Sequence, residues 1–221
     1  MNRRLPDIYD TLHQRFGPQN WWPAETPFEV VVGAILTQNT NWKNVEKAIA
    51  NLRDAGALEL ATINLMPRER LEELIRPSGF FRQKAARLQD FTLFLANEFD
   101  GSLDRLFCLD PDLLRQCLLD RPGIGPETAD SIILYAAGQP SFVVDAYTHR
   151  IFERVGLLGE MPDYDLTRSI FMENLPQDAN LFNEFHALIV RLAKEFCRKK
   201  EPLCRQCPIL SDCQYGQNSQ G

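Results

Sequence analysis

The stretch RPGIGPETADS, residues 121–131, constrains the fold more than any other part of this sequence. Apolar segments of helical pattern lie on both sides, PDLLRQCLLD before it and PETADSIILYAAG after it, so the turn between them is tight. Proline begins helices well, and glycine adopts backbone angles that other residues avoid. The pattern therefore predicts a helix–hairpin–helix at about 112–138, with a plain corner between two helices as the alternative.

The two hairpin glycines, Gly123 and Gly125, also predict a binding property. Both can adopt positive φ without the steric penalty of a Cβ, and both leave their amides bare. Together with the free N–H groups at the start of the next helix, these amides would form a nest for an anion such as a DNA phosphate.

The rest of the chain consists of short segments with helical periodicity, separated by proline and glycine. No strand alternation, tandem repeat or low-complexity linker is evident. The sequence therefore predicts an all-α protein. We expect YGQNSQG, at the C-terminus, to be a frayed tail, and Cys108 and Cys117 to lie in the core.

Composition limits the class of protein. The chain has 221 residues and 44% hydrophobic content, enough for a core, and no apolar run reaches the roughly 18–20 residues of a membrane span. MNRRLPDIYDTLHQRF lacks the apolar core of a signal peptide, so we expect a cytoplasmic protein. The net charge of −6 argues against non-specific coating of nucleic acid, although local basic clusters decide contact with phosphates.

Two such basic clusters are present. One includes Arg198, Lys199 and Lys200, and the other includes Lys84. Taken alone, either cluster can equally be a solvated face.

Four of the six cysteines fall within seventeen residues: Cys197, Cys204, Cys207 and Cys213. In a reducing compartment this density predicts a metal site. Zinc sites usually pair two Cys-x2-Cys knuckles some distance apart, which this sequence lacks, and four thiolates suit an iron–sulfur cluster equally well. The residue pattern alone leaves the metal open.

Asp145 follows the apolar run SFVV and precedes AYTHRIFERVG, so we expect it at the N-cap of a helix. Capping alone would explain an aspartate there. However, Asp145 also follows the hairpin by about twenty residues, and this spacing points to a known family.

The pairing of P-G-I-G with V-V-D resembles the helix-hairpin-helix (HhH-GPD) DNA glycosylases of the endonuclease III superfamily, over nearly the whole chain. The resemblance implies a two-lobed helical fold. Residues 24–138 would form a helical barrel domain with the hairpin, and residues 1–23 plus 139–221 a second domain with the cluster loop, 197–213. The cysteine spacing resembles the family's [4Fe–4S] cluster loop. The implied partner is double-stranded DNA with a damaged base. The protein itself would be a prokaryote-like, nucleoid-associated monomer that does not bind a membrane.

The resemblance also assigns DNA-facing roles. LTQNT resembles the segment that faces DNA with Gln38, and PSGFFRQKAARL resembles the turn that presents a wedge, here Phe80. The DNA backbone contacts would come from the hairpin and the two basic clusters: Gly123, Gly125, Lys84, Arg198, Lys199 and Lys200. Asp145, ionised, would be the catalytic residue and stabilise positive charge on the deoxyribose.

Members of the family that also nick DNA carry a lysine where this chain has Glu127, just before Thr128. A carboxylate cannot form the Schiff base that nicking requires, so this departure predicts a monofunctional glycosylase. A glutamate also attracts cationic bases such as N3- or N7-alkylated purines. NWWPAETPFEVVVGAILTQNTNW resembles the 3-methyladenine DNA glycosylase III branch, which implies a base pocket of Trp21, Trp22, Pro23, Trp42 and Glu127.

Several alternatives stay open at this point. The W-W-P run can be a core plug between helices. The protein can be a monofunctional glycosylase for oxidised or mismatched bases, a catalytically idle DNA-binding module, or a redox-sensing iron–sulfur protein.

Overall fold

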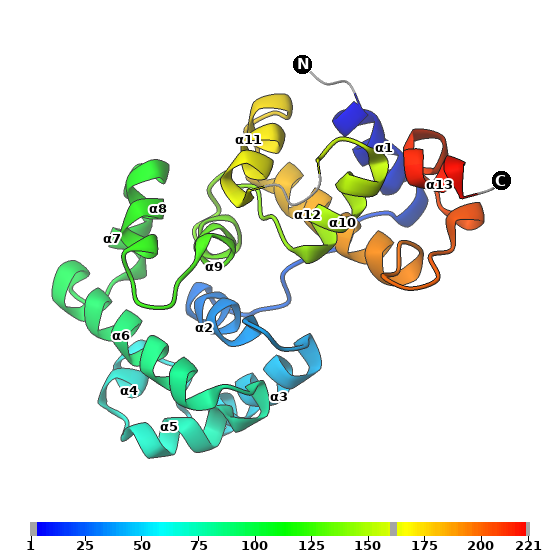
Figure 1. The fold of residues 1–221 in the computed structure, drawn as a ribbon. Coiled ribbons are helices and arrows are strands. Elements are labelled where there is room, and N and C mark those ends of the chain that lie inside the picture. The colour runs from blue at the N-terminus through cyan, green and yellow to red at the C-terminus, as the bar shows by residue number, and fades with distance from the viewer. Residues whose placement is uncertain (1–3, 160–162, 220–221) are drawn as a thin grey trace. The chain divides into compact units, whose positions relative to one another are not determined.

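The computed structural model describes residues 4–159 and 163–219, which are helical without any strand (Figure 1). The predicted all-α class is confirmed. The chain divides into two compact units. The continuous unit is Ala24–Gln139, and the discontinuous unit combines Met1–Pro23 with Pro140–Gly221.

The continuous unit ends at Gln139, one residue beyond the expected boundary at residue 138. The backbone N–H of Gln139 donates to the carbonyl of Ile133, and its Nε2 donates to the carbonyl of Phe107 at 2.6 Å. Both partners belong to the continuous unit, so these bonds hold Gln139 there.

The continuous unit is built around one buried helix, α2. Every residue of α2 from Phe28 to Leu36 is buried, which explains why this segment is apolar apart from Glu29. The helix packs against α3, α6, α9 and the π-helical turn that continues α9. The elements are α2 (Pro27–Thr37), α3 (Trp42–Asp54), α4 (Leu60–Leu65), α5 (Arg68–Ile75), η1 (Arg76–Ser78), α6 (Phe81–Phe99), α7 (Leu103–Phe107), α8 (Pro111–Leu119), α9 (Pro126–Ser131) and the π-helical η2 (Ile132–Ala136).

The discontinuous unit is built on α12, which packs against α1 and α10, while α13 packs against α10. Five phenylalanine rings from four segments form its centre, and the rings of Phe142 and Phe171 stack with centroids 4.0 Å apart. Its elements are α1 (Arg4–Phe16), α10 (Ala146–Val155), α11 (Tyr164–Asn174), α12 (Ala179–Glu195), η3 (Cys204–Gln206), η4 (Leu210–Asp212) and α13 (Gln214–Asn218).

The structure corrects two local expectations. The sequence predicts a frayed tail at YGQNSQG, but α13 spans Gln214–Asn218, and a Cβ on Gly216 would touch Leu210. The last two residues of this segment, 220–221, lie outside the described residues. Cys108 is exposed at the end of α7, so its predicted place in the core is wrong. The short helices α4 and α7 carry too little periodicity to be found from the sequence. Over the described ranges, no helix is long and apolar enough to cross a bilayer.

Candidate active site and DNA interface

The hairpin turn between α8 and α9 is anchored by its central isoleucine. Ile124 is 5% exposed, and its N–H donates to the carbonyl of Arg121 at 3.0 Å. Gly123 has φ of 79°. Gly125 has φ of −91° and is the extended N-cap residue of α9. Of the two hairpin glycines, only Gly123 uses the positive φ that glycine permits.

The start of α9 has no side-chain cap. Within the part of the chain that the structure describes, the N–H groups of Gly123 and Gly125 have no protein acceptor. Glu127 is exposed at the second position of this helix. The hairpin thus presents bare amides at a helix N-terminus, which is an arrangement that binds anions.

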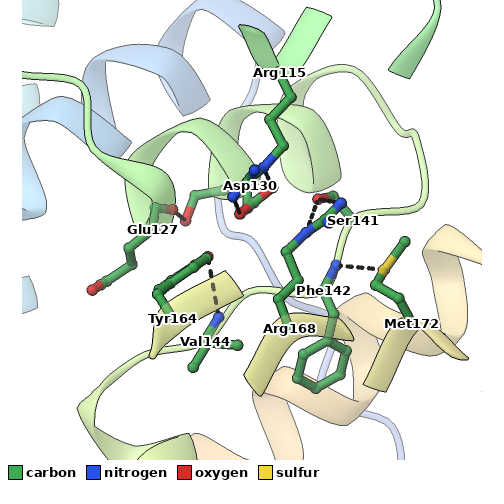
Figure 2. A network of polar contacts seen from close by, with 10 residues as sticks. Arg115, Glu127, Asp130, Ser141, Phe142, Val144, Tyr164, Arg168 and Met172 are labelled. Carbon is green, nitrogen blue, oxygen red and sulfur yellow. Dashed lines mark hydrogen bonds and ion pairs between the residues drawn. The ribbon is translucent and has the colours of Figure 1, made fainter. Parts of the chain in front are cut away.

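A buried ion pair joins the two hairpin helices (Figure 2). The guanidinium of Arg115, on α8, donates from Nε and Nη2 to the two carboxylate oxygens of Asp130, on α9, at 2.9 and 3.1 Å. Asp130 is fully buried. Paired donation of this kind fixes the relative orientation of the two groups, so the pair holds the hairpin rigid.

Gln38, just after α2, is held against the hairpin. Its Nε2 donates to the carbonyl of Gly123 and to Oγ1 of Thr128, both at 2.9 Å. Its Oε1 accepts from Arg87, on α6. The Arg87 side chain also covers Gly123, where an added Cβ would lie 2.1 Å from Nε of Arg87. The hairpin, Gln38 and Arg87 therefore form one connected group.

Phe80 stands at the N-cap of α6 with φ of 45°, after Gly79 with φ of 67°. The left-handed backbone is rare for an aromatic residue. The side chain is 62% exposed, which is unusual for a large apolar group. This turn therefore presents an aromatic ring to solvent.

Lys84 does not face solvent, so its predicted DNA contact is wrong. The residue is 1% exposed, and its ammonium donates to the carbonyls of Leu36 and Ser78 at 2.8 and 2.7 Å. Burial, with a smaller effect of Arg87, lowers the pKa of Lys84 to about 8. The first turn of α6 points this side chain into the unit, which the local density of basic residues did not reveal.

Asp145 is the N-cap of α10, as expected, and closes a capping box with Thr148. Its Oδ1 accepts from the backbone N–H groups of Tyr147 and Thr148 at 2.9 and 2.8 Å, and from Oγ1 of Thr148 at 3.0 Å. Its Oδ2 lies 3.6 Å from Nε2 of His186, on α12. The cap therefore uses one carboxylate oxygen and leaves the other to face His186.

The carboxylate of Asp145 is held ionised. Burial by itself would raise the pKa of Asp145, but His186 and the donors of Thr148 outweigh burial and hold the pKa below its usual value. A carboxylate of this kind is a weak proton acceptor and a strong source of negative potential.

The extended segment that leads to Asp145 is fixed by α11 (Figure 2). Arg168 donates to Oγ of Ser141 at 3.0 Å, and the N–H of Phe142 points to the sulfur of Met172 at 3.3 Å. These contacts, together with the buried side chains of the segment, set the position from which Asp145 starts its helix.

The four clustered cysteines line one pocket of the discontinuous unit. Burial, with smaller effects of the three neighbouring cysteines, raises the pKa of the Cys207 thiol to about 11. Apolar side chains from Phe196, Pro202, Leu210 and Tyr215 complete the wall. Among the described residues, no three histidine, cysteine or acidic side chains are placed to hold a single metal ion.

Two arginines of α10 bind the loop that carries Cys197. Arg150 donates to the carbonyl of Cys197 at 3.0 Å. Arg154 lies 3.3 Å from the Cys197 sulfur and donates to the carbonyl of Arg198 at 2.8 Å. Because the backbone is held in this way, the exposed side chains of Arg198, Lys199 and Lys200 are free to face solvent.

The tryptophans are divided between the units. Trp21 and Trp22, in the discontinuous unit, are half-buried, with ring centroids 5.9 Å apart, and are followed by the exposed Pro23. Trp42, in the continuous unit, begins α3 and packs against the core. The predicted base pocket therefore stays a prediction.

Residues 32–177 match the model of the HhH-GPD superfamily of base excision DNA repair proteins. The chain belongs to this superfamily. The resemblance on which the sequence analysis relied is confirmed.

Similar proteins extend the match of this HhH-GPD protein beyond residues 32–177. A protein of Methanocaldococcus jannaschii named "Putative DNA repair glycosylase MJ1434" is 51% identical over 93% of this chain and 94% of its own. The structure of H. pylori 3-methyladenine DNA glycosylase (MagIII) bound to 1,N6-ethenoadenine is 31% identical, with a TM-score of 0.75 over 86% of this chain and 96% of that chain. A non-covalent endonuclease III–DNA complex shares the fold, with 22% identity and a TM-score of 0.85 over 100% and 98% of the two chains.

The chain is thus a DNA repair glycosylase of this superfamily. Sequence reasoning missed two side chains that organise the site: His186 beside Asp145 and Arg154 beside Cys197. Arg87, which contacts Gln38, belongs to the same basic cluster of the sequence as Lys84. Each contact joins segments far apart in the sequence. Only the charge of each residue within a helical segment could have singled it out.

Proposed function

We propose that this glycosylase is monofunctional and hydrolyses the N-glycosidic bond of alkylated purines such as 3-methyladenine, leaving an abasic site. The observation that carries the proposal is the exposed carboxylate of Glu127, at the position where strand-nicking members have lysine. A carboxylate cannot form an imine with the sugar, and it favours a cationic base over a neutral one.

Similarity to the H. pylori 3-methyladenine DNA glycosylase supports the choice of substrate. In this proposal the rings of Trp42 and of Trp21 or Trp22 stack on the extruded base. Pro23 provides a wall, and Glu127 provides the charge. An aromatic ring attracts a cation by about 0.5–2 kcal/mol, so such a site would favour methylated purines.

The hairpin and the cluster loop would hold the DNA backbone. The bare amides of Gly123 and Gly125 suit a phosphate, and the side chains of Arg198, Lys199 and Lys200 are exposed and basic. Gln38 and Phe80 would fill the gap that the extruded nucleotide leaves in the duplex.

The chemistry would rest on the negative charge of Asp145. As the bond between C1′ and the base breaks, its electron pair leaves with the cationic base, which departs neutral. The sugar then carries the positive charge, and Oδ2 of Asp145 stabilises it. Water adds to C1′ and releases its proton to solvent. Because the pKa of Asp145 is low, this role is electrostatic more than one of proton transfer.

We further propose that Cys197, Cys204, Cys207 and Cys213 hold a [4Fe–4S] cluster. The convergence of four sulfurs on one largely apolar pocket supports it. A zinc ion needs all four sulfurs at about 2.3 Å from one point, whereas each sulfur of a cluster ligand set binds its own iron. When bound, the cluster would cross-link the C-terminal loop. We expect about four irons per chain in a brown protein, and one equivalent of zinc in a colourless protein would overturn this assignment.

Product analysis tests the monofunctional assignment. Incubated with a duplex that contains 3-methyladenine, the protein should release the free base, identified by mass, and leave the strand uncut until alkali is added. Borohydride should trap no covalent complex. Efficient trapping would show that another amine is the nucleophile and would overturn the assignment.

Glu127→Gln tests the substrate class. Removing the charge should slow release of 3-methyladenine up to about fivefold, the effect of an exposed ion pair, and should leave release of neutral 1,N6-ethenoadenine unchanged. Glu46→Gln, an exposed residue of α3, is the matched control and should slow neither. Equal losses on both bases in Glu127→Gln would remove the reason for choosing alkylated purines.

A further inference from the structure

The buried Lys84 is the one residue of the predicted DNA interface that cannot reach DNA. Its ammonium is enclosed in the continuous unit and donates to two carbonyls, those of Leu36 and Ser78. In the part of the chain that the structure describes, no carboxylate pairs with it. The charge is therefore balanced by backbone dipoles alone.

Each of the two carbonyls belongs to a residue at the end of a helix, two positions before a residue that we propose to enter the duplex. Leu36 is the penultimate residue of α2, and Gln38 follows it by two residues. Ser78 ends η1, and Phe80 follows it by two residues. The last carbonyls of a helix lack partners within the helix, so one ammonium here completes two helix ends at once.

A lysine is a costly choice for such a site. Burial disfavours its charged form, as its lowered pKa indicates, and a methionine would fill similar space without that penalty. Lysine differs from methionine in offering several N–H donors on one atom, which lets it bind both carbonyls together. The function of Lys84 should therefore depend on that double contact.

We propose that Lys84 is a positioning residue that holds the turn of Gln38 and the turn of Phe80 at a fixed separation, so that both side chains enter the duplex together. The inference rests on the proposed insertion of these two residues. Arg87, one turn further along α6, holds the Gln38 side chain itself. One helix would thus set the position of both inserted groups through two cations.

The test uses Lys84→Met in the full-length protein, with Lys47→Met, an exposed lysine of α3, as a control of equal charge change. The probe is a duplex with a tetrahydrofuran abasic analogue next to 2-aminopurine, whose fluorescence reports unstacking without any chemistry. Lys84→Met should lower the rate of unstacking by roughly tenfold, the effect of losing hydrogen bonds to a charged group, while Lys47→Met should match the wild type. Wild-type unstacking by Lys84→Met would overturn the inference.

A double-mutant cycle separates positioning from general loss of structure. In a protein that already carries Gln38→Ala and Phe80→Ala, Lys84→Met should add little further loss of unstacking, because nothing remains to be positioned. A full additional tenfold loss would overturn the inference. If Lys84→Met does not fold, judged by its melting transition, Lys84→Gln, which keeps one donor group, replaces it in the same cycle.

The two proposals fail in different ways. If the wild type releases no alkylated base but still unstacks the abasic duplex, and Lys84→Met does not, the substrate proposal fails and the role of Lys84 stands. If base release follows the proposed substrate class but Lys84→Met unstacks normally, only the role of Lys84 fails.

Discussion

The helices α9 and α10 begin in opposite ways. At α9 the N-cap is Gly125, no side chain bonds the first amides, and Glu127 is exposed. At α10 the N-cap is Asp145, whose Oδ1 accepts three hydrogen bonds from the start of its own helix. The start of α9 is open to an external anion, whereas the start of α10 is already occupied by the carboxylate of Asp145.

This difference assigns opposite electrostatic tasks to two similar pieces of backbone. An open helix start carries partial positive charge and attracts a phosphate. A start whose amides are satisfied by a carboxylate has that charge neutralised, and the remaining carboxylate oxygen offers negative potential to a cation. DNA glycosylases need both, because they hold an anionic backbone and stabilise a cationic sugar.

The largest effect should come from the occupied start. Asp145→Asn keeps the shape and the capping oxygen but removes the charge, so single-turnover base release should fall by about 10²–10³-fold while duplex affinity changes little. Asp163→Asn is the matched control, because Asp163 caps α11 in the same unit through the same kind of bonds. Near wild-type excision by Asp145→Asn would show that Asp145 acts only as a helix cap.

A smaller effect should come from the open start. Gly123→Ala forces a side chain into φ of 79° and against Arg87, so we expect about 1–2 kcal/mol loss of stability and weaker duplex binding. Gly125 has φ of −91°, and the space around an added Cβ is open. The free energy of unfolding of Gly125→Ala should therefore stay within about 0.5 kcal/mol of the wild type. Denaturant unfolding and binding titrations measure both, and equal effects would show that the turn geometry is not what matters.

The smallest effect should be a change in the free energy of unfolding at acid pH. The folded-state pKa of Asp145 is lowered, so its contribution to stability is complete above the unfolded value of about 4 and is lost as pH falls through the folded value. The difference in unfolding free energy between wild type and Asp145→Asn should therefore shrink as pH falls from 7 towards 3. A constant difference in urea unfolding would mean that Asp145 is not held ionised by its neighbours.

Much of this arrangement could be predicted from local patterns. The hairpin, the cap at Asp145 and the cysteine pocket depend on residues close together in the sequence, and the structure bears out their positions. The direction of Lys84 could not be predicted, because it depends on how the first turn of α6 faces α2. The contact of His186 with Asp145 joins α12 to α10, and no local pattern encodes it.

The discontinuous unit has a consequence for biosynthesis. Its first helix, α1, buries Leu5, Ile8 and Leu12 and packs on α12, which is synthesised after the whole continuous unit. The continuous unit is complete at Gln139 and can fold before α12 exists, whereas the apolar face of α1 stays uncovered until then. A nascent chain stalled before α12 should therefore expose this apolar face and bind chaperones.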